Sequence, residues 1–157
     1  MVIKERKPIV AVIGAAKPVA ALEKVAYRVG KQIAQKGWVL VNGGLSGVME
    51  ASAKGASEAG GLVVGILPGP ITQDANCYTT IPIATNMGHA RNVIIAHTAD
   101  CLVAVGGGEG TLSEIAIGLK LGKPVVGIKT WDIPGVVKVD SPDQAITSLE
   151  KINAKSK

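Results

Sequence analysis

The stretch Val105-Gly106-Gly107-Gly108-Glu109-Gly110-Thr111-Leu112-Ser113-Glu114 decides how this sequence of 157 residues is interpreted. An apolar run from Cys101 to Val105, typical of a buried strand, precedes it, and an amphipathic helical pattern follows. The glycines let the backbone turn through positive φ and leave its N–H groups uncovered by side chains. Together with the positive end of the following helix, these groups predict an anion site, most often for a phosphate, to which Thr111 adds a hydroxyl.

A purely structural interpretation of the same stretch is the alternative. Thr111 and Glu114 have the spacing of a capping box, in which Glu114 bonds back to the backbone N–H of Thr111 and only starts the helix. That interpretation explains neither the three glycines nor a second glycine-rich stretch, Gly43-Gly44-Leu45-Ser46-Gly47. We therefore favour the phosphate site.

Apolar runs alternate with helical patterns along the whole chain. The expected strands are residues 8–13, 38–41, 62–67, 79–84, 101–105 and 125–128, with a short seventh at 136–139. Phe is absent and glycine is abundant, a composition that suits a parallel sheet covered closely on both faces. The pattern predicts an α/β protein with one domain, residues 1–157: a doubly wound, Rossmann-like, mostly parallel sheet of six to seven strands with helices on both faces.

The topology of such a sheet brings the glycine-rich turns together. If the strand order is 3-2-1-4-5-6, a crevice opens between the first and the fourth strand. The turns after strands one, two, four and five then lie at one edge of the sheet, and a helix starts at Met87 with Asn86 as its N-cap. The residues expected to bind a ligand there are Gly14, Gly43, Gly44, Gly47, Met87, His89, Arg91, Asn92, Gly106, Gly107, Gly108, Glu109, Gly110 and Thr111.

Arg91 is expected at the start of a helix near this crevice, where an arginine needs an anionic partner. The partner is either a ligand phosphate or Glu114, and a structural Arg91–Glu114 ion pair is the alternative to a binding role. The usual dinucleotide fingerprint is missing, because only Gly14 follows the first strand and Asn42, not an acid, ends the second. Ordinary NAD binding is therefore disfavoured.

Charge and cysteine content narrow the class of protein. The net charge of +5 comes largely from lysines and arginines near the two ends, without a basic face bearing aromatic residues, so nucleic acid is an unlikely partner. Cys77 and Cys101 suggest neither a disulfide framework nor a metal site. No apolar run reaches the length of a membrane span, which predicts a cytoplasmic protein. The polar loop from Pro68 to Tyr78 is a candidate lid or specificity element.

With these residues in hand, the chain resembles the lonely-guy (LOG), or lysine-decarboxylase-like, superfamily over nearly its whole length. The family pattern Pro-Gly-Gly-x-Gly-Thr-x-x-Glu is matched by residues 106–114, and Met-His-x-Arg-Lys by residues 88–92. The earlier pattern Gly-Gly-x-x-Gly-x-Met is matched by residues 43–49. The chain is most similar to the short branch that includes the molybdenum cofactor carrier proteins.

The resemblance implies two functions. In the carrier branch the ligand is molybdenum cofactor, a pterin dithiolene with one phosphate, and the protein stores it or passes it to molybdoenzymes or cofactor-synthesis proteins. In the hydrolase branch the N-glycosidic bond of a nucleoside 5'-monophosphate is cleaved. Carried over, Arg91 would orient the phosphoribosyl group, and Glu114 would stabilise an oxocarbenium-like centre or activate water.

Three departures from the hydrolase pattern favour the carrier. Asn92 replaces the family lysine, Gly106 replaces the proline, and the chain reaches its last helix from Trp131 without the longer segment that shapes the base pocket of hydrolases. The resemblance also implies a homo-oligomer, a dimer or a tetramer, formed through helix faces beside the pocket.

Overall fold

The computed structural model describes residues 5–155, with side chains up to Ile152. Its centre is a sheet of seven strands in the order β4-β3-β2-β1-β5-β6-β7, and every neighbouring pair is parallel. This confirms the predicted α/β, Rossmann-like class. The strands are β1 (Ile9–Gly14), β2 (Val39–Asn42), β3 (Val63–Leu67), β4 (Ile81–Ala84), β5 (Cys101–Val105), β6 (Val125–Ile128) and β7 (Val136–Lys138).

The predicted strand order 3-2-1-4-5-6 is wrong. The fourth strand lies at the edge of the sheet beside β3, and β1 pairs with β5 instead. Pro82 and the half-exposed side chains of β4 suit an edge, because proline cannot donate to a second neighbour. All five residues of β5 are buried, as a central strand requires. The crevice at the reversal of strand order therefore opens between β1 and β5.

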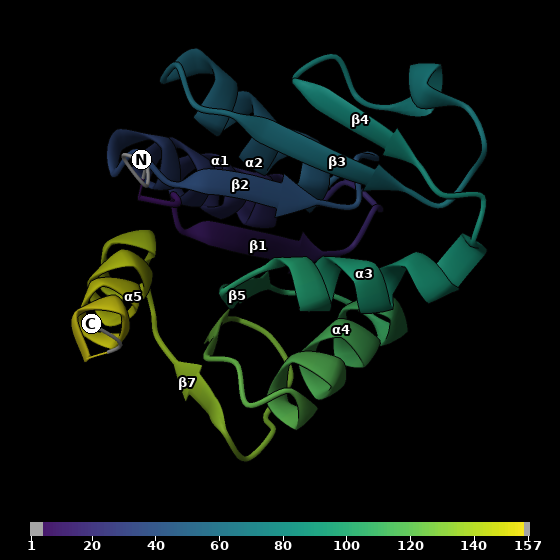
Figure 1. The fold of residues 1–157 in the computed structure, drawn as a ribbon. Helices are drawn as coiled ribbons and strands as arrows, with labels where there is room; N and C mark the ends of the chain where they lie inside the picture. The colour runs from purple at the N-terminus through teal and green to yellow at the C-terminus, as the bar shows by residue number, and fades with distance from the viewer. Residues whose placement is uncertain (1–4, 156–157) are drawn as a thin grey trace.

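Helices cover both faces of the sheet (Figure 1). On one face α1 (Ala20–Gln35), α2 (Val48–Glu58) and α5 (Pro142–Lys155) pack over a core that includes Val12, Val103 and Val126. On the other face α3 (Arg91–Thr98) and α4 (Glu109–Lys120) pack over a core that includes Ala11, Leu102 and Val125. The alternating directions of strand side chains account for the two cores. None of the helices within residues 5–155 is long and apolar enough to cross a membrane.

The helix predicted from Met87 begins later than expected. Two short 3₁₀ turns, η1 (Thr72–Asp74) and η2 (Gly88–Ala90), lie in the connections, and η2 leads directly into α3 at Arg91. Asn86 is not the N-cap, since its φ of 51° places it in the left-handed region, which asparagine tolerates. The turn places Arg91 at the very start of α3.

Helices α1 and α2 approach each other backbone to backbone. A Cβ atom on Gly30 would lie 2.0 Å from the carbonyl oxygen of Ser52, and one on Gly55 would lie 2.0 Å from that of Tyr27. No side chain fits at either position without moving a helix, so these glycines set the separation of α1 and α2.

We predict that Gly30→Ala lowers the free energy of unfolding by about 3 kcal/mol, since overpacking against a backbone oxygen forces the two helices apart. Gly110→Ala is the matched control, because a Cβ there meets nothing within 4 Å. Alanine is the better helix former, so the control is expected to be neutral or up to about 1 kcal/mol more stable. Urea denaturation measures both, and equal effects would contradict the packing argument.

Candidate functional site

A cavity of about 180 Å³ lies at the carboxyl ends of the strands, in the crevice between β1 and β5. Segments that follow β1, β2, β4 and β5 contribute to it, so the structure brings both glycine-rich loops to one place. Its lining comprises Val12, Ile13, Gly14, Ala16, Gly43, Leu45, Met49, His89, Arg91, Asn92, Gly110, Thr111 and Glu114. Sites that enclose a whole drug-sized ligand measure about 300–1,000 Å³, so this cavity fits only one end of such a ligand.

Arg91 brings a positive charge to the cavity with incomplete compensation. Its side chain is 8% exposed, and its Nη atoms donate to Asn92 Oδ1 and, at 3.4 Å, to the carbonyl oxygen of Gly43. Its Nε has no hydrogen-bond partner among the described residues. Burial lowers the pKa of Arg91, and the nearby charge of Glu114 partly opposes that change. A buried donor without an acceptor is costly, which makes this guanidinium a candidate to bind an anion.

Glu114 lines the same cavity from α4 but does not form the ion pair considered from the sequence. The ion pairs within residues 5–155, defined by a nitrogen–oxygen distance of at most 4.0 Å, do not include Arg91 with Glu114. Burial raises the pKa of Glu114 to about 7, and the charge of Arg91 limits the rise. The carboxyl group can therefore hold or release a proton near neutral pH.

The start of α4 supplies N–H groups that have no acceptor among residues 5–155, next to Arg91 in the cavity. Gly108 is the N-cap and makes no side-chain cap bond, and the first helical bond runs from Leu112 N to Gly108 O, 3.0 Å. Thr111 therefore lies inside the first turn, and the capping box of Thr111 and Glu114 that was the alternative to the phosphate site is not formed. The N–H groups at the start of a helix point out of its end with partial positive charge. Gly110 and Thr111 line the cavity there.

Asn92 ties the start of α3 to the start of α4. Its Nδ2 donates to Ser113 Oγ at 3.2 Å, and Ser113 Oγ donates to the carbonyl oxygen of Gly110 at 2.7 Å. Asn92, next to Arg91, and Ser113, two residues after Thr111, thus hold the two helix ends together. Sequence analysis missed Ser113, for which nothing but its place in the glycine-rich motif was a signal.

Asn42 shapes the second glycine loop and is completely buried. Its Nδ2 donates to Met49 O at 2.8 Å, and its Oδ1 accepts the N–H of Gly44 at 2.8 Å. The Gly44 amide is therefore occupied within the protein. Gly47 serves close packing, because a Cβ there would lie 2.4 Å from the carbonyl oxygen of Ala15. Of this loop only Gly43, Leu45 and Met49 reach the cavity.

The remaining predicted residues do not belong to the lining of the cavity. Met87 is half exposed just before η2, and Glu109 is exposed on the first turn of α4. Gly106 donates its N–H to the carbonyl oxygen of Ile128 at 3.0 Å, so that amide belongs to the sheet. Gly107 and Gly108 continue the turn from there to α4.

The loop from Pro68 to Tyr78, considered as a lid, is attached to the second glycine loop. Asn76 donates its backbone N–H to Gly44 O at 2.8 Å and its Nδ2 to Leu45 O at 3.0 Å. The loop therefore supports one wall of the site.

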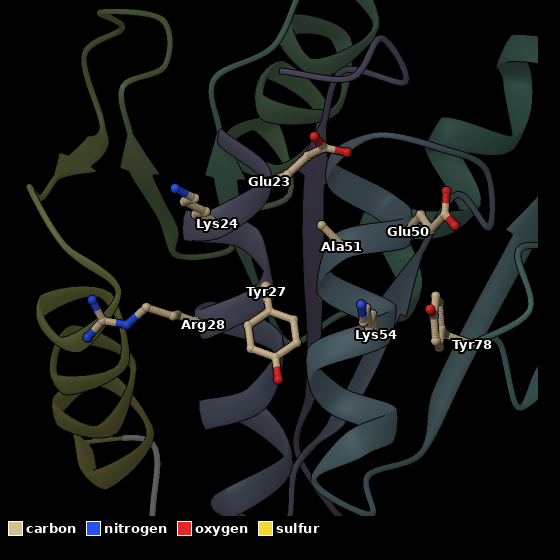
Figure 2. A pocket seen from close by; sticks show the side chains of 8 residues that line it. All are labelled: Glu23, Lys24, Tyr27, Arg28, Glu50, Ala51, Lys54 and Tyr78. Atoms are coloured by element: carbon tan, nitrogen blue, oxygen red, sulfur yellow. The ribbon is translucent and has the colours of Figure 1, made fainter. Parts of the chain in front are cut away.

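A larger cavity, about 580 Å³, lies on the outer face of α1 and α2 (Figure 2). Two of its polar groups have partners within the protein: the Tyr27 hydroxyl donates to Glu58 at 2.6 Å, and Lys54 Nζ lies 5.9 Å from the ring centre of Tyr78. It contains none of the predicted site residues.

The sequence pattern of the SLOG cluster4 family matches residues 7–155 of the chain. The chain belongs to this family. The cytokinin riboside 5'-monophosphate phosphoribohydrolase of Mycobacterium tuberculosis is 34% identical to it over 78% of the chain and 71% of that enzyme.

Two proteins of known structure have a higher sequence identity to this SLOG cluster4 protein than that enzyme has. The molybdenum cofactor binding protein of Rippkaea orientalis superposes with a TM-score of 0.90 at 38% identity, covering 95% of the chain and 99% of that protein. The molybdenum cofactor carrier protein of Chlamydomonas reinhardtii gives a TM-score of 0.88 at 41% identity, with the same coverage of each chain. These findings confirm the resemblance inferred from the three motifs.

We predict that Glu114→Gln stabilises the protein at pH 8 but not at pH 4. The pKa of this carboxyl is about 7 when folded against the usual 4.5, so the folded state holds the proton more tightly. The contribution of this bound proton to the free energy of unfolding is complete below pH 4.5 and is lost as the pH rises through 7. The variant should therefore gain about 2–3 kcal/mol of unfolding free energy over the natural protein at pH 8.

Urea denaturation at the two pH values measures this difference. Glu109→Gln removes an exposed carboxylate from the same helix and is expected to change stability by less than about 1 kcal/mol at either pH. A Glu114→Gln effect that does not depend on pH would contradict a buried, titrating carboxyl.

Proposed function

We propose that this protein is a molybdenum cofactor carrier that binds the phosphate of a phosphorylated pterin at the crevice between β1 and β5. The observation that carries the proposal is the buried guanidinium of Arg91, whose Nε lacks an acceptor within the described protein. A phosphate oxygen supplies an acceptor and a countercharge at once. The similarity to two molybdenum cofactor proteins over 95% of the chain supports the identity of the ligand.

The chemistry of the cavity suits one end of such a ligand. Arg91 and the N-terminal turn of α4, with Gly110 and Thr111, provide positive charge and N–H donors for the phosphate. At about 180 Å³ the cavity is smaller than sites that enclose a whole ligand, so the ring system of the pterin would extend from its mouth. This arrangement suits a carrier, because the enclosed phosphate end of the ligand gives affinity while the exposed ring system lets the ligand leave.

The second candidate function is hydrolysis of a nucleoside 5'-monophosphate, and Glu114 favours it. A carboxyl group with a pKa of about 7 beside an arginine can act as a general acid or base at neutral pH. The similarity to a phosphoribohydrolase supports the same alternative. In that function Arg91 would bind the phosphate and Glu114 would act at the glycosidic bond.

Equilibrium binding of molybdenum cofactor tests the carrier. We predict that Arg91→Gln raises the Kd about 10- to 100-fold, the range expected for losing a charge-assisted hydrogen bond of about 1.5–3 kcal/mol. Arg28→Gln, which removes an exposed arginine on α1, is the matched control and should leave the Kd unchanged. Thermal melts establish that each variant is folded. Equal affinity of Arg91→Gln and the natural protein would overturn the proposed site.

Release of free base from AMP-type nucleotides tests the hydrolase. We predict none above the uncatalysed rate for the natural protein, because Asn92 and Gly106 replace residues of the hydrolase pattern. Chromatography of the reaction mixture gives the measurement, and Glu114→Gln is the control. Base release that disappears in Glu114→Gln would overturn a pure carrier function and establish the enzyme.

A further inference from the structure

The segment after β6 makes two hydrogen bonds to the turn formed by Gly106, Gly107 and Gly108. The binding site described above does not account for these two bonds. Thr130 Oγ1 donates to the carbonyl oxygen of Gly106 at 2.6 Å, and Trp131 Nε1 donates to that of Gly108 at 3.1 Å. Both bonds join positions more than 20 residues apart in sequence. Gly106 also donates its N–H to Ile128 O, so both its polar backbone groups face β6.

These bonds determine which way the neighbouring N–H groups point. In a planar trans peptide the C=O of one residue and the N–H of the next point in opposite directions. With Gly106 O held toward Thr130, the N–H of Gly107 points away from β6. Gly108 O accepts both from Leu112 N, in the first helical bond of α4, and from Trp131 Nε1, so the N–H of Glu109 points away from both donors and out of the N-terminal end of the helix. Because the strand order is β1-β5-β6, the direction away from β6 at the end of β5 is toward β1 and the crevice.

A run of glycines needs such external bonds. Gly106 and Gly107 have φ values of 56° and 108°, and glycine passes between positive and negative φ more easily than any other residue. A turn free to rotate its peptides would present a carbonyl oxygen to an anion part of the time, and would lose entropy on becoming ordered around it. Preorganised donors avoid both costs.

We propose that Thr130 and Trp131 are positioning residues of the anion site, which help to fix the carbonyls of Gly106 and Gly108 so that the N–H groups of Gly107 and Glu109, outside the cavity lining itself, face a phosphate bound at the rim next to Gly110 and Thr111. The proposal rests on the anion site of the proposed function. Neither residue lines the cavity, and both act through the turn. Trp131 is 40% exposed, so its indole N–H could bond to water, and its bond to Gly108 serves the turn rather than its own burial.

Binding of inorganic phosphate to the full chain, measured by calorimetry, tests the two bonds separately. Thr130→Val keeps the shape and removes the hydroxyl, while Trp131→Phe keeps an aromatic ring and removes the N–H. We expect each to raise the Kd for phosphate about 5- to 10-fold and the double variant to raise it further. Thr130→Ser restores the donor and should restore the affinity. Asp132→Asn, in the same segment but paired with Lys138, is the matched control and should bind as the natural protein does.

Amide NMR shifts distinguish positioning from a general effect on stability. In the natural protein, phosphate should shift the amide signals of Gly107 and Glu109, and these shifts should shrink in Thr130→Val and Trp131→Phe even where thermal melts are unchanged. Phosphate binding by the natural protein with unaltered Kd and amide shifts in both variants would overturn this inference and leave the carrier intact. Failure of the natural protein itself to bind phosphate would overturn the anion site and this inference together.

Discussion

The central electrostatic constraint on this structure is the buried positive charge of Arg91, which makes no ion pair within residues 5–155. Arg91 lies at the first turn of α3, almost fully buried, with Asn92 and a backbone carbonyl as neutral acceptors and with Nε unpartnered in the part of the chain that the structure describes. Glu114 contributes an attractive charge but lies beyond ion-pair distance and has a carboxyl pKa near 7. Burying a charge in this way is unfavourable unless an anion completes the site. An anion bound in the crevice, as in the proposed function, would supply the missing countercharge and acceptor.

The backbone around that charge is arranged by residues that do not touch the cavity. Asn42 holds the loop after β2, Ser113 bridges the starts of α3 and α4, and Thr130 with Trp131 holds the turn after β5. Each of these bonds ends on a backbone group of a glycine-rich segment or on a side chain beside one. Glycine allows the close approach, and the surrounding side chains supply the rigidity that glycine lacks.

Carrier and hydrolase share the requirement for phosphate binding and differ in what the rest of the cavity does. A hydrolase needs Glu114 at the reacting centre in one particular protonation state. A carrier needs only that the Glu114 carboxyl does not repel the phosphate. A carboxyl group that is partly protonated at neutral pH meets the second requirement. In the proposed carrier, the small cavity would enclose the phosphate end and leave the larger group outside.

The sequence by itself determined the alternation of strands and helices, the Rossmann-like class and the placing of two glycine-rich turns at one edge of the sheet. These follow from local apolar periodicity and from the fact that parallel strands end on the same side. Only the tertiary structure decided the strand order, which depends on which strand can be buried on both edges. Pro82 and the half-exposed side chains of β4 suit the edge of the sheet, so the crevice lies between β1 and β5 and not between the first and the fourth strand.

The same limit applies to the site. The motifs identified Arg91, Glu114 and the glycines, because each residue type has a characteristic chemistry. Whether Arg91 meets Glu114, and which amides stay free, depends on distances between segments that no local pattern records. Thr130 and Trp131 show this most clearly, since their role exists only because β6 lies beside β5 and carries them to the carbonyls of the turn.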